Sequence, residues 1–289
     1  MKVKALAKIN LGLDVIRKRE DGYHEVRMVM QTIQMYDVIH LYKAARPGIR
    51  LHTNLPYIPT DERNLVYKAA RLLMDEFHIR RGLRIDLQKF IPVSAGMAGG
   101  SSDAAATLVA VNRLFHLRLT KRELMRRGVS IGADVPYCVM RGTALAEGVG
   151  EKLTMLPAAP DCYVLVGKPA LNVSTKQAYE SLCLSEITNH PDIHSLAQAI
   201  RDNDLPAMLP HMENVFEPGL TRENPVIGQI KDLMLENGAF HAMMSGSGPT
   251  VFGLFRSWET QQKAANVLRE SQLAKTVFAT RFFNSRRRR

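Results

Sequence analysis

The sequence has few of the residues that mark disulfide-stabilised or metal-binding proteins. Its three cysteines, Cys138, Cys162 and Cys183, are far apart and lack the C-x-x-C spacing. Neither a disulfide framework nor a zinc site is therefore expected. The nine histidines are scattered, and His190 and His194 are the one pair at helical spacing. Because metal sites usually bring three or more donors together, this pair alone does not predict one.

Long hydrophobic runs are also missing. The longest stretch without Asp, Glu, Lys or Arg runs from Asn237 to Phe255, and glycine, proline and serine interrupt it. We therefore expect no membrane-spanning helix. The first four residues alternate charged with apolar side chains and do not resemble a signal or transit peptide. A cytoplasmic location is the resulting expectation.

The composition is that of an ordinary globular protein. The chain has 289 residues, of which 46% are hydrophobic and 23% are charged. At roughly 150 residues per domain, this length suggests two domains. The proline-bearing segment 156–160 is the expected linker, so we place the domains at 1–157 and 158–284, followed by a disordered basic tail at 285–289.

The net charge is +11, and four of these positive charges belong to the terminal run Arg286–Arg289. A positive excess attracts small anionic substrates as well as polynucleotides. An RNA-binding protein is therefore one alternative, although the sequence has no basic, aromatic-rich strand like those that stack RNA bases.

Apolar periodicity predicts a mixed α and β architecture. A period of two between Val3 and Val15 predicts a long strand, with Lys8 and Asn10 about 6.8 Å apart on its polar face. From this segment alone, two side chains that face water are the simpler interpretation. The following elements are expected as a turn at 21–23, a strand at 26–30, a helix at 65–77, a strand at 83–91, helices from 101 and after 120, a loop at 132–136 and a strand at 137–146.

The second half of the sequence predicts an α+β domain. After a strand at 162–166 and helices from 174 and at 196–200, the order helix, strand, strand, helix, strand runs to residue 283. This order around one sheet is the plan of ferredoxin-like domains.

The segment 92–106 is the most informative part of the sequence. A strand ends, an eleven-residue run of mostly small residues follows from Pro92 to Ser102, and a helix begins. Free N–H groups at a helix start, together with the positive end of the helix dipole, bind anions. The run matches neither G-x-x-x-x-G-K-[ST] nor G-x-G-x-x-G. A tight turn with a serine cap is the alternative, but the length of the run favours a phosphate site.

Three motifs resemble those of the GHMP kinase superfamily, which includes galactokinase and homoserine, mevalonate and phosphomevalonate kinases. Ala5–Leu11 resembles the first motif, 92–106 the second, and Met244–Phe252 the third. The resemblance implies a two-domain α+β fold. The N-terminal ATP-binding domain would be ribosomal-protein-S5-domain-2-like, and the C-terminal substrate-binding domain would be ferredoxin-like.

Within the superfamily, Asp21–His24, Gly132–Pro136 and Glu147–Glu151 resemble members that act on a cytidine diphosphate-linked polyol in the non-mevalonate route to isoprenoids. The resemblance implies an ATP-dependent phosphotransferase whose acceptor is the tertiary 2-hydroxyl of a methylerythritol unit. Another GHMP kinase, such as a homoserine kinase, is the alternative. We expect a small-molecule substrate, no membrane, no specific nucleic acid, and a monomer or weak homodimer.

The resemblance carries the catalytic and ATP-binding roles to particular positions. Asp134 aligns with the general base and Lys8 with its partner lysine, which would keep that carboxylate ionised. A magnesium ion is expected with ATP, and its ligands are unknown, with Ser102 as one suggestion. The ATP-binding positions are Pro92, Val93, Ser94, Ala95, Gly96, Met97, Ala98, Gly99, Gly100, Ser101, Ser102 and Asn64.

Other positions would bind the acceptor. Tyr23 and Tyr179 would sandwich the cytosine while His24 reads its edge. Without the resemblance, isolated tyrosines are more often core residues, and Asp134 more often caps a loop. The substrate-binding positions are Asn10, Tyr23, His24, Ser174, Thr175, Tyr179, Gly246, Ser247 and Gly248.

The second motif departs from the family pattern at four positions. Ser94, Ala95 and Ala98 stand where some members have glycine, and these residues are small enough to preserve the grip on phosphate. Asp103 stands where some members have asparagine. Because an acid near a phosphate is unfavourable, the role of Asp103 stays open.

Overall fold

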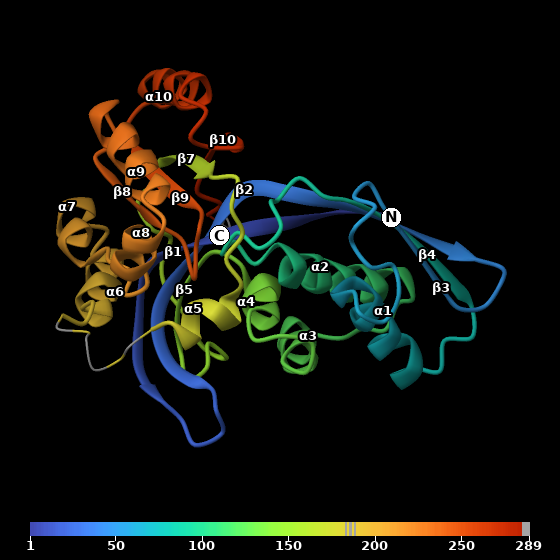
Figure 1. The fold of residues 1–289 in the computed structure, drawn as a ribbon. Coiled ribbons are helices and arrows are strands. Elements are labelled where there is room, and N and C mark those ends of the chain that lie inside the picture. The colour runs from blue at the N-terminus through green and yellow to red at the C-terminus, as the bar shows by residue number, and fades with distance from the viewer. Residues whose placement is uncertain (183, 185–186, 188, 285–289) are drawn as a thin grey trace. The chain divides into compact units, whose positions relative to one another are not determined.

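The computed structural model describes residues 1–182, 184, 187 and 189–284 (Figure 1). The expected tail at 285–289 and Cys183 lie outside the described residues. The contacts divide the chain into two compact units, each built from separated segments. The first unit comprises Met1–Ala7, Met35–Val93 and Ala98–Met140, and the second comprises Lys8–Gln34, Ser94–Met97 and the remainder from Arg141. The predicted domain boundary at 157 stays a prediction.

Two long strands contribute to both units, and the other elements belong to one. The shared strands are β1 (Lys2–Lys18) and β2 (His24–Ala44). The first unit adds β3 (Ile49–Thr53), α1 (Leu65–Glu76), β4 (Gly82–Gln88), α2 (Gly99–Leu114), α3 (Lys121–Gly128) and α4 (Val135–Met140). The second adds β5 (Thr143–Glu147), β6 (Lys152–Met155), β7 (Tyr163–Lys168), α5 (Thr175–Glu180), α6 (Ile193–Arg201), α7 (Leu205–Met208), η2 (Leu209–His211), α8 (Glu217–Glu223), α9 (Val226–Glu236), β8 (His241–Met244), β9 (Val251–Phe255), α10 (Trp258–Glu270) and β10 (Thr276–Arg281).

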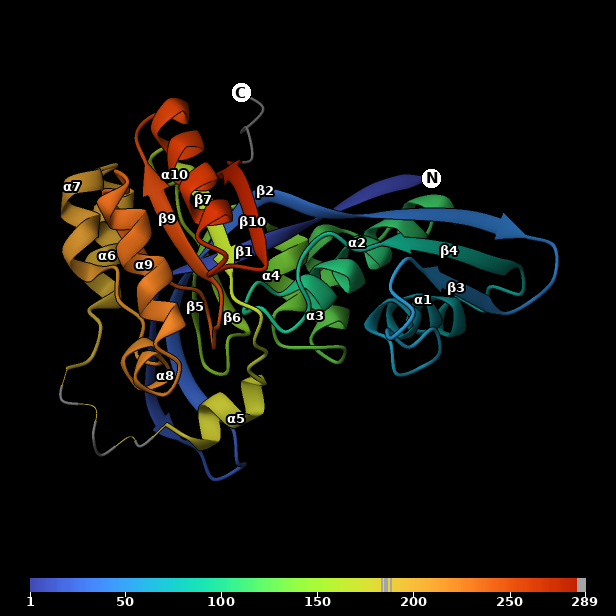
Figure 2. The ribbon, with the colours of Figure 1, turned by 45° about the horizontal axis from the view of Figure 1, so that its top comes forward.

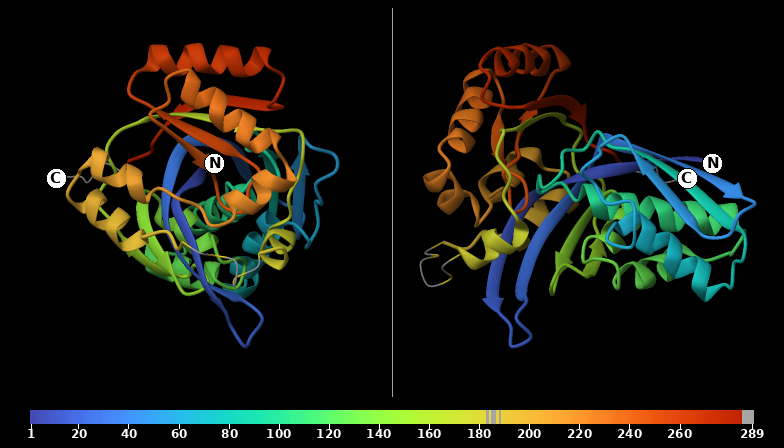
Figure 3. Two further views of the ribbon diagram at one scale, coloured as in Figure 1. Left: turned by 60° about the vertical axis from the view of Figure 1, so that its left-hand side comes forward. Right: turned by 45° about the vertical axis from the view of Figure 1, so that its right-hand side comes forward.

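The first sheet contains both long strands. Its order is β3-β4-β2-β5-β6, and β1 also pairs with β2. Figure 3 shows β1 and β2 running side by side to the turn that joins them. The prediction of a long strand at 3–15 is confirmed, but every residue from Ala5 to Val15 is buried. The interpretation that Lys8 and Asn10 face water is therefore wrong, since their exposed fractions are 5% and 0%.

The second sheet, β10-β7-β9-β8, is antiparallel throughout. Helices α9 and α10 contact each other and pack on one face of it (Figure 2). Gly167 in β7 explains how the helices come so close, because a Cβ there would lie 3.0 Å from Ile230 of α9 and from Leu268 of α10. This arrangement confirms the predicted ferredoxin-like domain.

The expected strand at 137–146 is wrong in its first half. Val135–Met140 form the helix α4, Arg141 and Gly142 turn the chain with positive φ angles, and β5 begins at Thr143. All six residues of α4 are buried, so the apolar run has no periodicity that distinguishes a helix from a strand. The short strands β3 and β6 were not predicted.

Caps explain where several helices begin. Thr120 and Glu123 form a capping box at the start of α3, and Ser174 and Ser257 cap α5 and α10 through their hydroxyl groups. Among the described residues, no helix is both long and apolar enough to cross a membrane.

Candidate active site

Residues of the first, second and third motifs meet in the second unit. The Lys8 ammonium donates to Asn10 Oδ1 at 2.6 Å and to the Gly96 carbonyl at 3.0 Å. The Ser245 hydroxyl donates to that carbonyl at 3.2 Å and accepts from the Asn10 N–H at 3.3 Å. The Lys8 N–H donates to the Met97 carbonyl at 3.2 Å. Segments separated by up to 235 residues are thus joined around one buried ammonium group.

Two glycines allow the second and third motifs to approach each other. A Cβ on Gly96 would lie 2.2 Å from the Ser245 carbonyl oxygen, and one on Gly246 would lie 2.8 Å from the Gly96 carbonyl oxygen. Both glycines also have positive φ angles, +67° and +58°. No other residue satisfies both the space and the backbone conformation at these positions.

A buried asparagine holds the turn of the third motif. Asn214 Nδ2 donates to the carbonyls of Met244 and Gly246, both at 2.8 Å, while its Oδ1 accepts from Phe216 N–H at 3.1 Å. Sequence reasoning missed Asn214, since no pattern around it connects it with residues thirty positions later. It also omitted Ser245 from the predicted site, although Ser245 lies within the third motif.

The backbone of the glycine-rich loop has the geometry of an anion site. Positive φ angles recur at every second residue, at Ser94, Gly96 and Ala98. Alternation of this kind turns successive N–H groups toward one side, which forms a concave nest for anions. Helix α2 begins at Gly99, rather than at Ser101, and no side chain caps its N-terminus. The serine cap that the alternative required is therefore absent, while the phosphate-binding role of the loop stays a prediction.

The side chains that follow this loop have structural partners. The Ser102 hydroxyl is buried and donates to the Leu6 carbonyl at 2.6 Å, which ties α2 to β1. Asp103 is also buried, and Lys89 binds its carboxylate at 2.7 Å. This contact shows what Asp103 does in the fold, the question that the sequence left open.

Asn64 caps α1. Its Oδ1 accepts from Val66 N–H at 2.9 Å, and its Nδ2 donates to the Pro59 carbonyl at 2.7 Å. Both polar atoms of the Asn64 side chain therefore have hydrogen-bond partners at the start of this helix. An adenosine contact through Asn64 stays a prediction.

Asp134 lies in the turn immediately before α4, in the first unit. Its carbonyl accepts from Cys138 N–H at 3.0 Å, and its side chain is partly exposed. The buried helix α4 therefore anchors the partly exposed residue next to it. The pairing of Asp134 with Lys8 stays a prediction.

An aromatic cluster forms at the predicted base site. The rings of His24 and Tyr179 are tilted by 34° with centroids 4.9 Å apart, and Phe216 meets Tyr179 edge-on at 4.8 Å. Burial, and then the Lys18 charge, lower the pKa of His24, which favours the neutral imidazole. Tyr23 is 66% exposed at the tip of the β1–β2 hairpin. A sandwich formed by Tyr23 and Tyr179 stays a prediction, and Phe216 is a neighbour that the sequence did not indicate.

The start of α5 contacts the third motif. Thr175 Oγ1 lies 3.2 Å from Ser247 Oγ, and Ser174 Oγ accepts from Gln177 N–H at 3.1 Å. The first contact brings two predicted substrate-binding residues, Thr175 and Ser247, together in the second unit, and Ser174 is the chain neighbour of Thr175.

No group of three histidine, cysteine or acidic side chains that could hold a metal occurs in the part of the chain that the structure describes. His190 Nδ1 lies 2.8 Å from Asp14 Oδ1, so its partner is a carboxylate on β1. Burial raises the pKa of the Cys162 thiol to about 12, which keeps it protonated and unreactive.

Two segments of the chain match models of the same kinase family. Residues 64–142 match the GHMP kinases N terminal domain, and residues 196–273 match the GHMP kinases C terminal domain. With the motif geometry described above, these matches define a small-molecule kinase fold. The chain belongs to the GHMP kinase family.

The similar proteins include several with one name. A 4-diphosphocytidyl-2-C-methyl-D-erythritol kinase of Lachnospira eligens is 52% identical over 98% of both chains, and one of Clostridium perfringens is 47% identical over 99% of both. A crystal structure of 4-(cytidine 5'-diphospho)-2C-methyl-D-erythritol kinase has a TM-score of 0.84 and 31% identity, covering 99% of this chain and 100% of that one. A homoserine kinase of Cytophaga hutchinsonii has a TM-score of 0.74 at 21% identity over 95% and 92% of the two chains, which shows the fold alone.

Proposed function

We propose that this chain is an ATP-dependent kinase that phosphorylates the 2-hydroxyl of 4-diphosphocytidyl-2-C-methyl-D-erythritol, in isoprenoid precursor biosynthesis by the non-mevalonate route. Relatives with that name, 46–52% identical over 93–99% of this chain, support the substrate. The structural observation that carries the proposal is the meeting of the three motifs at Lys8, Gly96 and Ser245. A cytoplasmic location and a monomer or weak homodimer belong to the same proposal.

The loop from Pro92 to Ser102 would bind the ATP phosphates through its backbone. The alternating φ angles and the uncapped N-terminus of α2 supply N–H donors, and the helix dipole adds partial positive charge. Because small side chains line this run, the phosphates can approach the backbone closely. Asn64 would contact the adenosine at the start of α1.

Phosphoryl transfer requires positioning, charge neutralisation and a route for one proton. Asp134 would accept the proton of the 2-hydroxyl while that oxygen forms its bond to the γ-phosphorus. The bond from the γ-phosphorus to the bridging oxygen breaks, and ADP leaves. Lys8 would stabilise the negative charge of the transferred group, and burial strengthens this interaction because water screens it less. Asn10 holds the Lys8 ammonium in place and would orient the acceptor.

A magnesium ion would accompany ATP and supply charge neutralisation at the phosphates. Magnesium usually keeps several waters and takes one or two protein ligands besides the phosphates, so a cluster of acids is not needed. Asp103 is committed to Lys89, and the Ser102 hydroxyl donates to Leu6. These contacts do not identify the magnesium ligands, and the suggestion that Ser102 is one of them stays a prediction, because a hydroxyl group that donates its proton can still offer its oxygen to a cation.

The cytidine moiety would be bound by the aromatic cluster. A neutral His24 can both donate and accept a hydrogen bond, as the edge of a cytosine requires. Tyr179 and the exposed Tyr23 offer ring faces for stacking, worth about 0.5–1.5 kcal/mol beyond burial. Ser174, Thr175 and the turn Gly246–Gly248 would complete the substrate site from the second unit.

Mass spectrometry of the product tests the proposal. Purified protein is incubated with ATP, magnesium and either the cytidyl substrate or homoserine, and ADP release is followed in parallel. We expect a singly phosphorylated cytidyl product and no phosphohomoserine. Phosphorylation of homoserine instead would establish the alternative kinase, and salt-sensitive RNA binding without ATP turnover would refute kinase function altogether.

A further inference from the structure

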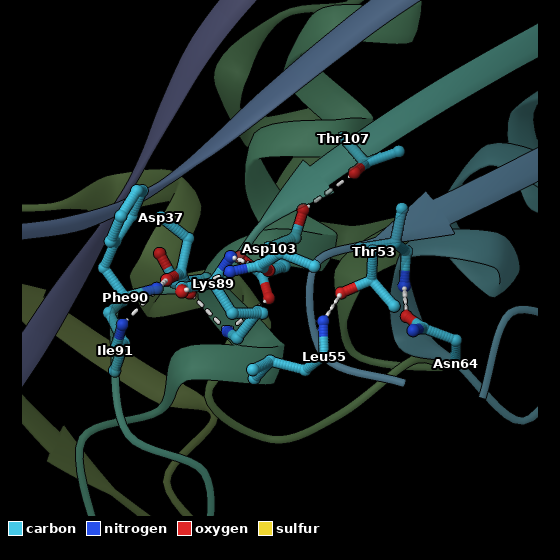
Figure 4. A network of polar contacts seen from close by, with 12 residues as sticks. Asp37, Thr53, Leu55, Asn64, Lys89, Phe90, Ile91, Asp103 and Thr107 are labelled. Carbon is cyan, nitrogen blue, oxygen red and sulfur yellow. Dashed lines mark hydrogen bonds and ion pairs between the residues drawn. The ribbon is translucent and has the colours of Figure 1, made fainter. Parts of the chain in front are cut away.

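Three charged side chains that the proposed mechanism does not use are buried together in the first unit (Figure 4). The exposed fractions of Asp37, Lys89 and Asp103 are 0%, 8% and 2%. The Lys89 ammonium forms ion pairs with both carboxylates, at 2.7 Å to Asp103 and also closely to Asp37. Burying a charge costs free energy, and apolar side chains would fill the same space at a lower cost. We therefore expect this cluster of three charged side chains to have a role other than filling the core.

Asp37 holds the segment that leads into the glycine-rich loop. It lies on β2, and its Oδ1 accepts from the N–H groups of Phe90 and Ile91, the second at 2.8 Å. These two residues directly precede Pro92, the first residue of the loop. The carboxylate on β2 therefore determines where the loop begins.

Asp103 belongs to the helix that leaves the same loop. It lies four residues after Gly99, the first residue of α2. The Lys89 ammonium also lies against the start of this helix, because a Cβ built on Gly99 would be 3.3 Å from Lys89 Nζ and 3.1 Å from Ile91 Cγ2. One ammonium group thus connects both ends of the loop.

The backbone of Lys89 is itself fixed. Asn54, which follows β3, accepts from Lys89 N–H at 2.8 Å and donates to the Lys89 carbonyl at 3.2 Å. The pairing of β3 with β4 ends at Thr53 and Leu87, and the Asn54 side chain extends the contact between the two segments beyond that point. The lysine therefore has a rigid base from which its ammonium reaches the two carboxylates.

One ammonium group lies between two carboxyl groups, so the cluster has one positive charge for two acids. Burial lowers the pKa of Lys89, but the carboxylates of Asp103 and Asp37 outweigh it and raise that pKa overall, so the ammonium stays charged. Burial raises the pKa of Asp103 well above its usual value, Lys89 opposes this, and Asp37 adds to it. Asp103 Oδ1 has no hydrogen-bond partner among the described atoms. Asp103 is therefore the member of the group that a neutral amide can best replace.

We propose that Asp37, Lys89 and Asp103 are positioning residues of the ATP-binding loop, and that the Lys89 ammonium sets the spacing between the segment that enters the loop and the helix that leaves it. This inference rests on the proposed assignment of residues 92–102 to the ATP phosphates. Loss of the ammonium would shift the loop N–H groups away from the phosphates. Binding of the cytidyl substrate, which uses residues of the second unit, would change little.

The test compares Lys89→Met with Lys176→Met, which removes an exposed lysine on α5. Calorimetric titration gives the ATP affinity, and steady-state kinetics give KM for ATP and for the cytidyl substrate separately. We expect Lys89→Met to weaken ATP binding and raise KM for ATP about tenfold, or ~1.4 kcal/mol. KM for the cytidyl substrate should stay within about twofold, a limit that exceeds ordinary assay scatter but lies well below a tenfold loss. An unchanged KM for ATP in a folded Lys89→Met protein overturns the inference.

A second variant keeps the test valid if Lys89→Met does not fold. The triple variant Asp37→Asn, Lys89→Met, Asp103→Asn removes all three charges, and such neutral replacements are often tolerated. The side-chain amide oxygen introduced by Asp37→Asn could still accept from the Phe90 and Ile91 N–H groups. A folded triple variant with weakened ATP binding supports the inference, whereas wild-type ATP affinity refutes it. If instead the proposed function is wrong, the wild-type protein itself forms no phosphorylated cytidyl product, so the two failures can be told apart.

Discussion

Substitution of Gly96 by alanine tests whether the second and third motifs need direct backbone contact. The new Cβ would lie 2.2 Å from the Ser245 carbonyl oxygen and 3.2 Å from the Gly248 nitrogen, so backbone must move. The left-handed φ of +67° adds about 1–2 kcal/mol of strain for any residue with a Cβ. Displacement of the Gly96 carbonyl would also remove its hydrogen bond from the Lys8 ammonium, worth about 1.5–3 kcal/mol.

The sum of these two effects predicts that Gly96→Ala lowers the free energy of unfolding by at least about 2 kcal/mol. Because Lys8 loses one of its oxygen partners, we also expect kcat to fall about tenfold or more. Gly219→Ala is the matched control, since Gly219 lies in α8 without positive φ and a Cβ there would meet nothing within 4 Å. Urea unfolding followed by circular dichroism and a coupled ADP-release assay give the two quantities. A Gly96→Ala protein within about 0.5 kcal/mol of wild type, the range of ordinary surface substitutions, would refute the reasoning.

Three further substitutions test other parts of the structure. Asp134→Ala should lower kcat by about 10²–10⁴-fold with an unchanged melting temperature, and near wild-type turnover would exclude a general base at this position. Asn214→Asp should cost at least about 1–3 kcal/mol in chemical denaturation, because a carboxylate cannot donate to the Met244 and Gly246 carbonyls. The raised pKa of Asp103 means that its contribution to stability is present below the unfolded-state pKa and is lost as pH rises through the folded-state pKa. The stability of Asp103→Asn relative to wild type should therefore increase from about pH 4 upward, and a pH-independent difference would contradict a raised pKa.

Local features of the sequence predicted much of the secondary structure. The period of two in β1 and the helix starts expected after 120 and from 174 depend on residues within a few positions of one another. The glycine-rich loop belongs to the same group. Its backbone conformation is favoured by a run of mostly small residues, and this local pattern predicts a phosphate site.

Features that depend on distant partners could not be predicted in this way. Apolar residues between 135 and 140 fit a helix or a strand equally well until burial on every side selected α4. Lys8 and Asn10 alternate with apolar residues in the same way as exposed polar residues would, and their burial depends on contacts with residues far along the chain, such as Gly96 and Ser245.

The local sequence thus determined the short-range geometry of this protein, including that of the loop that would bind ATP. Tertiary structure alone decided which charges are buried and what neutralises them. Asp37, Lys89 and Asp103 are far apart along the chain, and no local pattern connects them. Ion pairs of this kind depend on distances in space, and the sequence records only distances along the chain.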